Sequence, residues 1–299
     1  MSIFNHIPGK LKQDFNYCRT IVHNHSENFP VGSLLAPSRI RPHLYAIYAF
    51  ARTADDFADL PGRSDQVRLQ LLDDWSRRLQ KAASGEPNHP IFNALTYTFE
   101  ATGLPPTPLF DLLTAFRMDV TIKTYDTTRE LLDYCRYSAN PVGRMMLHLA
   151  DVEPYLPHSQ SVERQLWSDA ICTALQLANH WQDLGQDAWS GRPLYLPKEE
   201  MDRYEVTAEM IKSRRFSPML GGLMLHLVAE TRALFEEGEP LLTAVKWPLN
   251  LELGVIWESG MALLEQIEEL GGNTLRSRPS LSNWDRLGCF RHALTRTWS

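Results

Sequence analysis

The stretch "YAIYAFARTADDFAD", residues 45–59, sets acidic side chains among apolar and aromatic ones. Four polar positions recur at steps of four, three and four, which places them on one stripe of an α-helix: Tyr48, Arg52, Asp55 and Asp59. Asp56 stands about 100° from Asp55 around the axis of such a helix. Neighbouring carboxylates repel one another unless a cation lies between them. The stretch therefore predicts a helix whose acidic stripe binds a cation. The alternatives are an acidic surface patch near a helix end and a simple pair between Arg52 and Asp55.

A second polar stripe occurs in "LQLANHWQDLGQD", residues 175–187. Its members recur at steps of three, four and four on a helix that otherwise carries mainly leucine, alanine and tryptophan: Gln176, Asn179, Asp183 and Asp187. Polar atoms on a buried helix need hydrogen-bond partners or ligands. A hydrogen-bonded helix crossing would also satisfy this pattern.

The two stripes together favour a metal site over a surface acidic patch or ion pair at the first and a hydrogen-bonded helix crossing at the second. Their candidate ligand atoms are all oxygens, and His180 is the only imidazole nearby. Hard oxygen ligands suit Mg²⁺, which usually keeps several waters and is bridged by phosphate oxygens. We therefore expect the two helices to face one cavity and to hold a diphosphate through Mg²⁺, with Arg52 adding positive charge. An apolar, aromatic helical cavity would suit a carbocation and long hydrocarbon chains.

Composition excludes several other classes of function. The chain has 299 residues and a formal net charge of -6, which argues against a nucleic-acid partner. It contains no apolar run long enough for a transmembrane helix, and its first residues lack the apolar core of a signal peptide. The four cysteines are widely spaced and fit free thiols in a reducing compartment. We expect a cytoplasmic protein, and the sequence leaves peripheral contact with the inner face of the membrane open.

Helical periodicity runs through most of the chain and predicts an all-α fold in a single domain, residues 1–299. Proline residues fall mostly between the helical segments, where they end or begin helices. The predicted helices cover 40–60, 65–81, 90–102, 108–123, 128–138, 141–149, 161–187, 207–212, 219–237, 251–270 and 282–295. The best strand candidate is short, residues 192–197.

The two acidic motifs, in this order and about 125 residues apart, resemble those of the squalene/phytoene synthase family. The resemblance extends over nearly the whole chain, from about His25 to about Leu281. It implies the class I isoprenoid synthase fold, with a central cavity and a prenyl diphosphate substrate. It also implies that Mg²⁺ is bound by Asp55, Asp56, Asp59, Asn179, Asp183 and Asp187. Among these, the catalytic carboxylates would be Asp55, Asp59, Asp183 and Asp187.

The same resemblance implies a set of substrate-binding residues in five segments. Tyr48 and Arg52 of the first motif look like substrate and diphosphate contacts, and Gln176 like part of the cavity wall. "HSENF", residues 25–29, resembles a segment that caps the site, and "SANPVG", residues 138–143, a helix kink that lines the prenyl pocket. "LRSRPSLS", residues 275–282, resembles a basic segment that contacts diphosphate. The residues implied in these three segments are Ser26, Phe29, Val142, Gly143, and either Arg276 or Arg278.

One position departs from the usual family pattern. Squalene and phytoene synthases usually have arginine immediately before the aspartate that corresponds to Asp183, whereas Gln182 stands here. This variant is similar to the hydroxysqualene synthase subgroup of bacterial hopanoid pathways. The resemblance implies conversion of presqualene diphosphate and water to hydroxysqualene and diphosphate. It also implies functional coupling to a presqualene diphosphate synthase and to a downstream reductase.

Other activities stay open at this point. The same fold supports synthesis of presqualene diphosphate, squalene, dehydrosqualene or phytoene. A non-catalytic scaffold relative would have lost motif carboxylates, and both sets are present here. The product would be nearly insoluble in water, so peripheral contact with a membrane is expected, although no segment of the sequence marks it.

Overall fold

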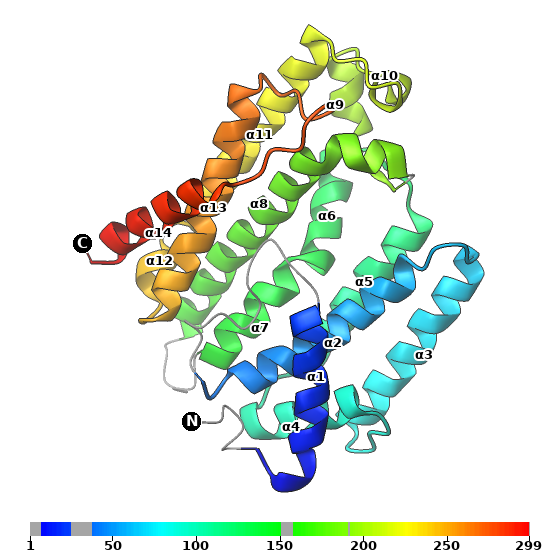
Figure 1. The fold of residues 1–299 in the computed structure, drawn as a ribbon, viewed down its shortest axis with the longest axis vertical. Helices are drawn as coiled ribbons and strands as arrows, with labels where there is room; N and C mark the ends of the chain where they lie inside the picture. The colour runs from blue at the N-terminus through cyan, green and yellow to red at the C-terminus, as the bar shows by residue number, and fades with distance from the viewer. Residues whose placement is uncertain (1–6, 25–37, 151–157, 191, 299) are drawn as a thin grey trace. The chain divides into compact units, whose positions relative to one another are not determined.

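The computed structural model describes residues 7–24, 38–150, 158–190 and 192–298 (Figure 1). Within these ranges the chain is almost entirely helical. The elements are η1 (Gly9–Leu11), α1 (Lys12–Asn24), α2 (Arg41–Ala58), α3 (Asp65–Ala83), α4 (Pro90–Thr102), α5 (Thr107–Thr121), β1 (Thr124–Tyr125), α6 (Thr128–Ser138), α7 (Asn140–Ala150), α8 (His158–Ser190), β2 (Leu194–Pro197), α9 (Lys198–Arg203), α10 (Ala208–Lys212), α11 (Pro218–Gly238), α12 (Leu241–Ala244), α13 (Leu249–Glu269) and α14 (Asn283–Trp298). The all-α prediction is confirmed.

The described helices pack as two compact units, and the division falls within α7, after Gly143. The first unit contains α1 to α5 and the remainder of α7, with α2 in contact with α1, α3, α4 and α5. Aromatic side chains fill the space around α2. Trp75 donates its Nε1–H to the backbone oxygen of Phe50 at 3.3 Å, and the two rings stack with centroids 5.9 Å apart. The buried face of α2 is thus fixed by its neighbours.

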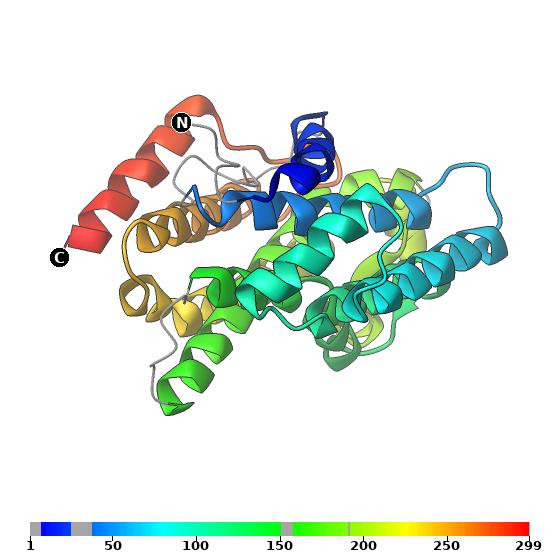
Figure 2. The ribbon, with the colours of Figure 1, turned by 90° about the horizontal axis from the view of Figure 1, so that it is seen from below.

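The second unit is organised around α8, which packs chiefly against α11. The helices α13 and α14 lie side by side within the same unit (Figure 2). The strands β1 and β2 form a short parallel pair, so the single strand expected near residues 192–197 is present and has a two-residue partner. The prediction of one domain over residues 1–299 stays a prediction.

Three further features bear on the sequence-based expectations. No disulfide joins the four cysteines, which all lie in the described ranges, and Cys18, Cys135 and Cys289 are buried. No helix in the described part of the chain is both long and apolar enough to cross a membrane. All eleven predicted helices are found with small shifts at their ends, while α1, α9 and α12 were not predicted.

Candidate active site

The first acidic motif occupies the last turns of α2. Its acidic side chains lie outside the buried face of this helix. Ala46, Phe50 and Ala54 are fully buried in the core of the first unit. Tyr48, one stripe position of the helix, is partly buried and packs against that core. The side chains of Asp55 and Asp56 are 38% and 48% exposed, and Asp59 is exposed at the end of the helix. The predicted helix with its acidic stripe is therefore confirmed.

Arg52 pairs with two carboxylates of this motif. Its guanidinium lies 3.4 Å from Asp55 and 2.7 Å from Asp56. Even so, the pKa of Asp55 is raised to about 7, first because of desolvation and then because of the negative charge of Asp59; Arg52 acts in the opposite direction, and Asp119 and Asp56 raise the pKa further. The negative charge here exceeds what one arginine neutralises. A bound cation would favour the ionised form of Asp55.

Asp119 is a member of this acidic group that the sequence did not reveal. It lies near the end of α5, which packs against α2, and its charge acts on Asp55. No motif marks it, because the contact joins two helices that are distant in sequence. We therefore add Asp119 to the residues that shape the charge of the first motif.

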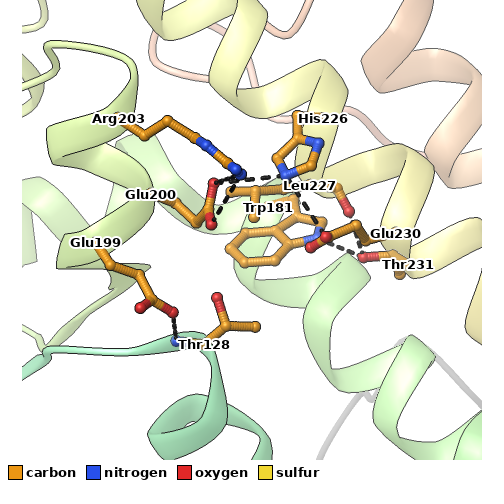
Figure 3. A network of polar contacts seen from close by, with 9 residues as sticks. All are labelled: Thr128, Trp181, Glu199, Glu200, Arg203, His226, Leu227, Glu230 and Thr231. Carbon is orange, nitrogen blue, oxygen red and sulfur yellow. Dashed lines mark hydrogen bonds and ion pairs between the residues drawn. The ribbon is translucent and has the colours of Figure 1, made fainter.

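The second acidic motif lies in the last four turns of α8. Asn179 and Asp183 are half-buried, and Asp187 is buried. Trp181, inside the motif, fixes this part of α8 against α11: its Nε1–H donates to the Oγ1 of Thr231 at 2.8 Å, and the Thr231 hydroxyl donates to the backbone oxygen of Leu227 at 2.8 Å (Figure 3). The tryptophan thus orients the helix face that carries the motif.

Polar contacts around Trp181 connect further elements to the same region. The Nε2 of His226 on α11 lies 3.5 Å from carboxylate oxygens of Glu200 and of Glu230, and thereby links α9 to α11 (Figure 3). Glu199 accepts a hydrogen bond from the backbone N–H of Thr128 at 2.7 Å, at the start of α6. These contacts support the helix framework around α8.

His180 is a neutral packing residue of the motif helix. Its ring stacks on Tyr195 of β2 with centroids 3.8 Å apart and an interplanar angle of 11°. Burial lowers the pKa of His180 to about 3. Gln176 donates its amide N–H to His180 Nε2 at 3.3 Å, so the imidazole sets the orientation of that amide. The role of Gln176 in a cavity wall stays a prediction.

The connection between α13 and α14 crosses the second motif. Gly185 of α8 makes this crossing possible, because a Cβ at that position would stand 2.6 Å from the backbone oxygen of Leu275 and 2.7 Å from that of Thr274. Arg278 on the same connection binds Asp183 with two guanidinium nitrogens, Nε on Oδ1 and Nη2 on Oδ2, the latter at 3.3 Å. Arg276 is exposed, and no hydrogen bond or ion pair joins it to another described residue. The structure thus brings Arg278, and not Arg276, to the motif.

The remaining predicted residues belong to other segments of the chain. Ser26 and Phe29 fall outside the described residues. Val142 is 47% exposed in the first turn of α7. Gly143 lies where a Cβ would overlap with the side chains of Ser168 and Cys172 on α8, so a small residue is needed for the approach of the two helices. The interruption between α6 and α7 agrees with the expected kink, while a prenyl-lining role for Val142 and Gly143 stays a prediction.

The donor atoms of both motifs fit Mg²⁺. They are carboxylate and amide oxygens, and no three His, Cys, Asp or Glu side chains among the described residues converge as a complete metal site. Mg²⁺ usually takes only one or two carboxylates from a protein and completes its coordination with water and phosphate oxygens. Burial, and after it the charge of Asp59, raises the pKa of Asp55, and a bound cation would offset both effects.

Comparisons with known proteins agree with the motifs. The family model "Squalene/phytoene synthase" matches residues 22–285. A hydroxysqualene synthase of Rhodopseudomonas palustris is 37% identical over 231 residues, 77% of this chain and 75% of the relative. One of Zymomonas mobilis is 36% identical over 244 residues, 80% of this chain and 78% of the relative. The crystal structure of a squalene synthase (HpnC) of Alicyclobacillus acidocaldarius matches with a TM-score of 0.82 and 37% identity, and covers 91% of this chain and 99% of that one.

Proposed function

The chain belongs to the squalene/phytoene synthase family, and from this premise we propose that it is a hydroxysqualene synthase. Such an enzyme converts presqualene diphosphate and water to hydroxysqualene and diphosphate. The observation that carries the proposal is the similarity over most of the chain to two proteins of that name, together with two intact acidic motifs on α2 and α8.

We propose Mg²⁺ as the cofactor, held by the six oxygen-bearing residues of the two motifs: Asp55, Asp56, Asp59, Asn179, Asp183 and Asp187. When bound, the metal supplies positive charge that stabilises the departing diphosphate. Arg52 and Arg278 bind carboxylates of the two motifs, and both can donate hydrogen bonds to diphosphate oxygens. The carbon–oxygen bond to diphosphate breaks, and the cyclopropylcarbinyl cation rearranges with opening of its three-membered ring. Water forms the new carbon–oxygen bond to the resulting allylic cation, and a proton is released. No nucleophilic side chain is needed.

A product assay with Mg²⁺ and without NADPH tests the proposal. Purified protein would receive either presqualene diphosphate or farnesyl diphosphate alone, and extracts would be analysed by mass spectrometry. We expect hydroxysqualene from presqualene diphosphate and no condensation product from farnesyl diphosphate. Formation of presqualene diphosphate, dehydrosqualene or a C40 product from simple prenyl diphosphates would instead assign a sister activity of the family.

We also propose that the protein touches an anionic lipid surface through the outer face of α14. Trp284 is 81% exposed, Leu287 49% and Phe290 38%, and these residues are spaced by three along the helix. Two exposed arginines, Arg286 and Arg291, accompany them on α14. Exposed tryptophan and apolar side chains with neighbouring arginines are typical of helices that lie in a membrane interface.

Contact with lipid would let the product, a nearly insoluble C30 alcohol, leave directly into the membrane. A downstream reductase could take it up there, and a presqualene diphosphate synthase would supply the substrate.

A further inference from the structure

The connection between α13 and α14, residues 270–282, is held to α8 at three places; we call it the C-terminal strap (Figure 1). Thr274 and Leu275 are 2% exposed where their backbone oxygens approach Gly185. Further along, Pro279 is bound by Gln182, and Arg278 by Asp183. The strap is therefore held against the second acidic motif rather than passing over it loosely.

Gln182 uses both ends of its side-chain amide to hold the strap. The Nε2 group donates to the backbone oxygen of Pro279 at 2.6 Å, and Oε1 accepts a hydrogen bond from Nη2 of Arg278 at 3.0 Å. Gln182 is only 4% exposed, and its bond to Pro279 is buried, while its bond to Arg278 is partly buried. A side-chain amide can donate to a carbonyl through its nitrogen and accept from a guanidinium through its oxygen at the same time. Gln182 is thus a positioning residue for Arg278.

The ion pair between Arg278 and Asp183 would have to open before a metal ion could bind the same carboxylate. Its Nε and Nη2 bind the two carboxylate oxygens of Asp183, one each. A bidentate guanidinium uses the lone pairs in the carboxylate plane that a divalent cation also needs. The pair is partly exposed, with 36% of the Arg278 side chain and 28% of the Asp183 side chain accessible, so its strength is modest and it can open.

We propose that Arg278 is an internal counter-cation of Asp183 that a divalent metal displaces, and that Gln182 keeps the displaced guanidinium beside the motif to bind the anion that accompanies the metal. The bond from Gln182 to Pro279 does not involve Asp183, so it can persist when the pair between Arg278 and Asp183 opens. The inference rests on the proposed function only in taking Asp183 as a metal ligand and a diphosphate as the anion.

Metal binding without substrate tests the displacement. Mn²⁺ would be titrated into the purified full-length protein, and free Mn²⁺ measured by electron paramagnetic resonance. Because Arg278→Gln removes the competing cation, we expect Mn²⁺ to bind roughly threefold more tightly, in line with the modest strength of a partly exposed ion pair. Arg276→Gln removes the same charge from the same strap without touching Asp183 and should leave the affinity unchanged. In an Asp183→Asn background, Arg278→Gln should have no effect.

An unchanged or weaker Mn²⁺ affinity in Arg278→Gln would overturn the displacement. An equal gain in Arg276→Gln would also overturn it, because the effect would then be one of net charge. These titrations contain no prenyl substrate. They therefore give a result even if the product assay assigns another activity of the family, and failure of one proposal is distinguishable from failure of the other.

Inorganic pyrophosphate tests the positioning role of Gln182. Its affinity for the Mn²⁺-loaded protein would be measured by calorimetry for Gln182→Met, Arg278→Gln and the double variant. Methionine keeps the length of the side chain and loses both hydrogen bonds. We expect about a tenfold weaker pyrophosphate affinity in each single variant and little further loss in the double variant, because both act through the same guanidinium. An unchanged affinity in Gln182→Met, or additive losses in the double variant, would contradict the positioning role.

Discussion

Asp183 is a single residue with two roles, because it binds Arg278 in this structure and is also our candidate ligand for Mg²⁺. Asp183→Asn removes the carboxylate charge and keeps its shape. We expect turnover of presqualene diphosphate to fall roughly 100-fold or more, since losses of this order follow from disturbing even the supporting residues of a metal site.

The control for Asp183→Asn is Asp133→Asn, which removes an exposed carboxylate from α6. It should retain wild-type turnover, and both variants should show the circular dichroism of the parent. If Asp183→Asn kept most of its activity, its proposed role as a metal ligand would be wrong.

The second prediction at the residue scale concerns Gly185. A Cβ at this position would overlap with the backbone of Thr274 and Leu275, which cannot move away as a flexible side chain could. Gly185→Ala should therefore destabilise the protein by about 2 kcal/mol and displace the strap. Urea unfolding would measure the loss. As a control, Gly288→Ala changes a glycine of α14 that has open space around it. Wild-type stability in Gly185→Ala would show that the strap does not lie against α8.

The sequence predicted individual site residues only where they recur along one helix. The stripes on α2 and α8 follow from spacing alone, and both are present. The choice between Arg276 and Arg278 could not be made, because it depends on how the strap crosses α8 near Gly185. Asp119 was missed because its effect on Asp55 arises from the packing of α5 against α2.

At the scale of elements, the contact between α2 and α4 predicts a dependence of stability on pH. His43 of α2 is buried, and its Nδ1 lies 3.0 Å from the Oγ1 of Thr98 on α4. The Thr98 hydroxyl donates to the backbone oxygen of Ala94, so its oxygen accepts from Nδ1–H of a neutral imidazole. Burial lowers the pKa of His43 from 6.5 to about 4.

The sign of this dependence follows from linkage. Above pH 6.5 both the folded and the unfolded state carry neutral His43, and its contribution to stability is fully present. Between pH 6.5 and about 4 only the unfolded state takes up the proton, so the free energy of unfolding falls as the pH falls, by about 3 kcal/mol in all. Urea unfolding of the parent and of His43→Phe across this range would measure it. Identical pH profiles for the two proteins would contradict the prediction.

The limits of the helices were predictable where apolar positions recur over several turns, as in α4 and α6. The elements that were missed lack such a signal. α9 has six residues and α12 has four, too few to define a period, and β1 has only two. α1 buries only Phe15, Cys18 and Val22 and owes its place to contacts with α2 and α4. Tertiary packing rather than local pattern stabilises such segments.

At the scale of the whole molecule, lipid binding depends on a contrast in charge. The chain has a net charge of -6, whereas the outer face of α14 carries exposed arginines and aromatic side chains. The inner face of this helix is anchored to α13: the guanidinium of Arg296 lies 4.5 Å from the centre of the Trp257 ring and pairs with Glu258 at 3.0 Å. A helix fixed in this way can present Trp284 and Leu287 outward without unfolding. An acidic protein that carries a basic, aromatic face on α14 should approach anionic lipid with this face toward the lipid.

Cosedimentation with lipid vesicles tests this orientation. We expect the protein to bind vesicles that contain phosphatidylglycerol, and to bind less as salt rises, because each arginine near an anionic surface contributes about 1 kcal/mol that salt screens. The double variant Trp284→Ser, Leu287→Ser should bind at least tenfold more weakly, since it removes the apolar side chains that enter the interface. Trp189→Ser is the matched control, because Trp189 is 83% exposed at the end of α8 and lies beneath Arg214 instead. Equal losses of vesicle binding in the two variants would mean that α14 has no special part in lipid binding. If the protein bound only neutral vesicles, the proposed role of the α14 arginines would be wrong.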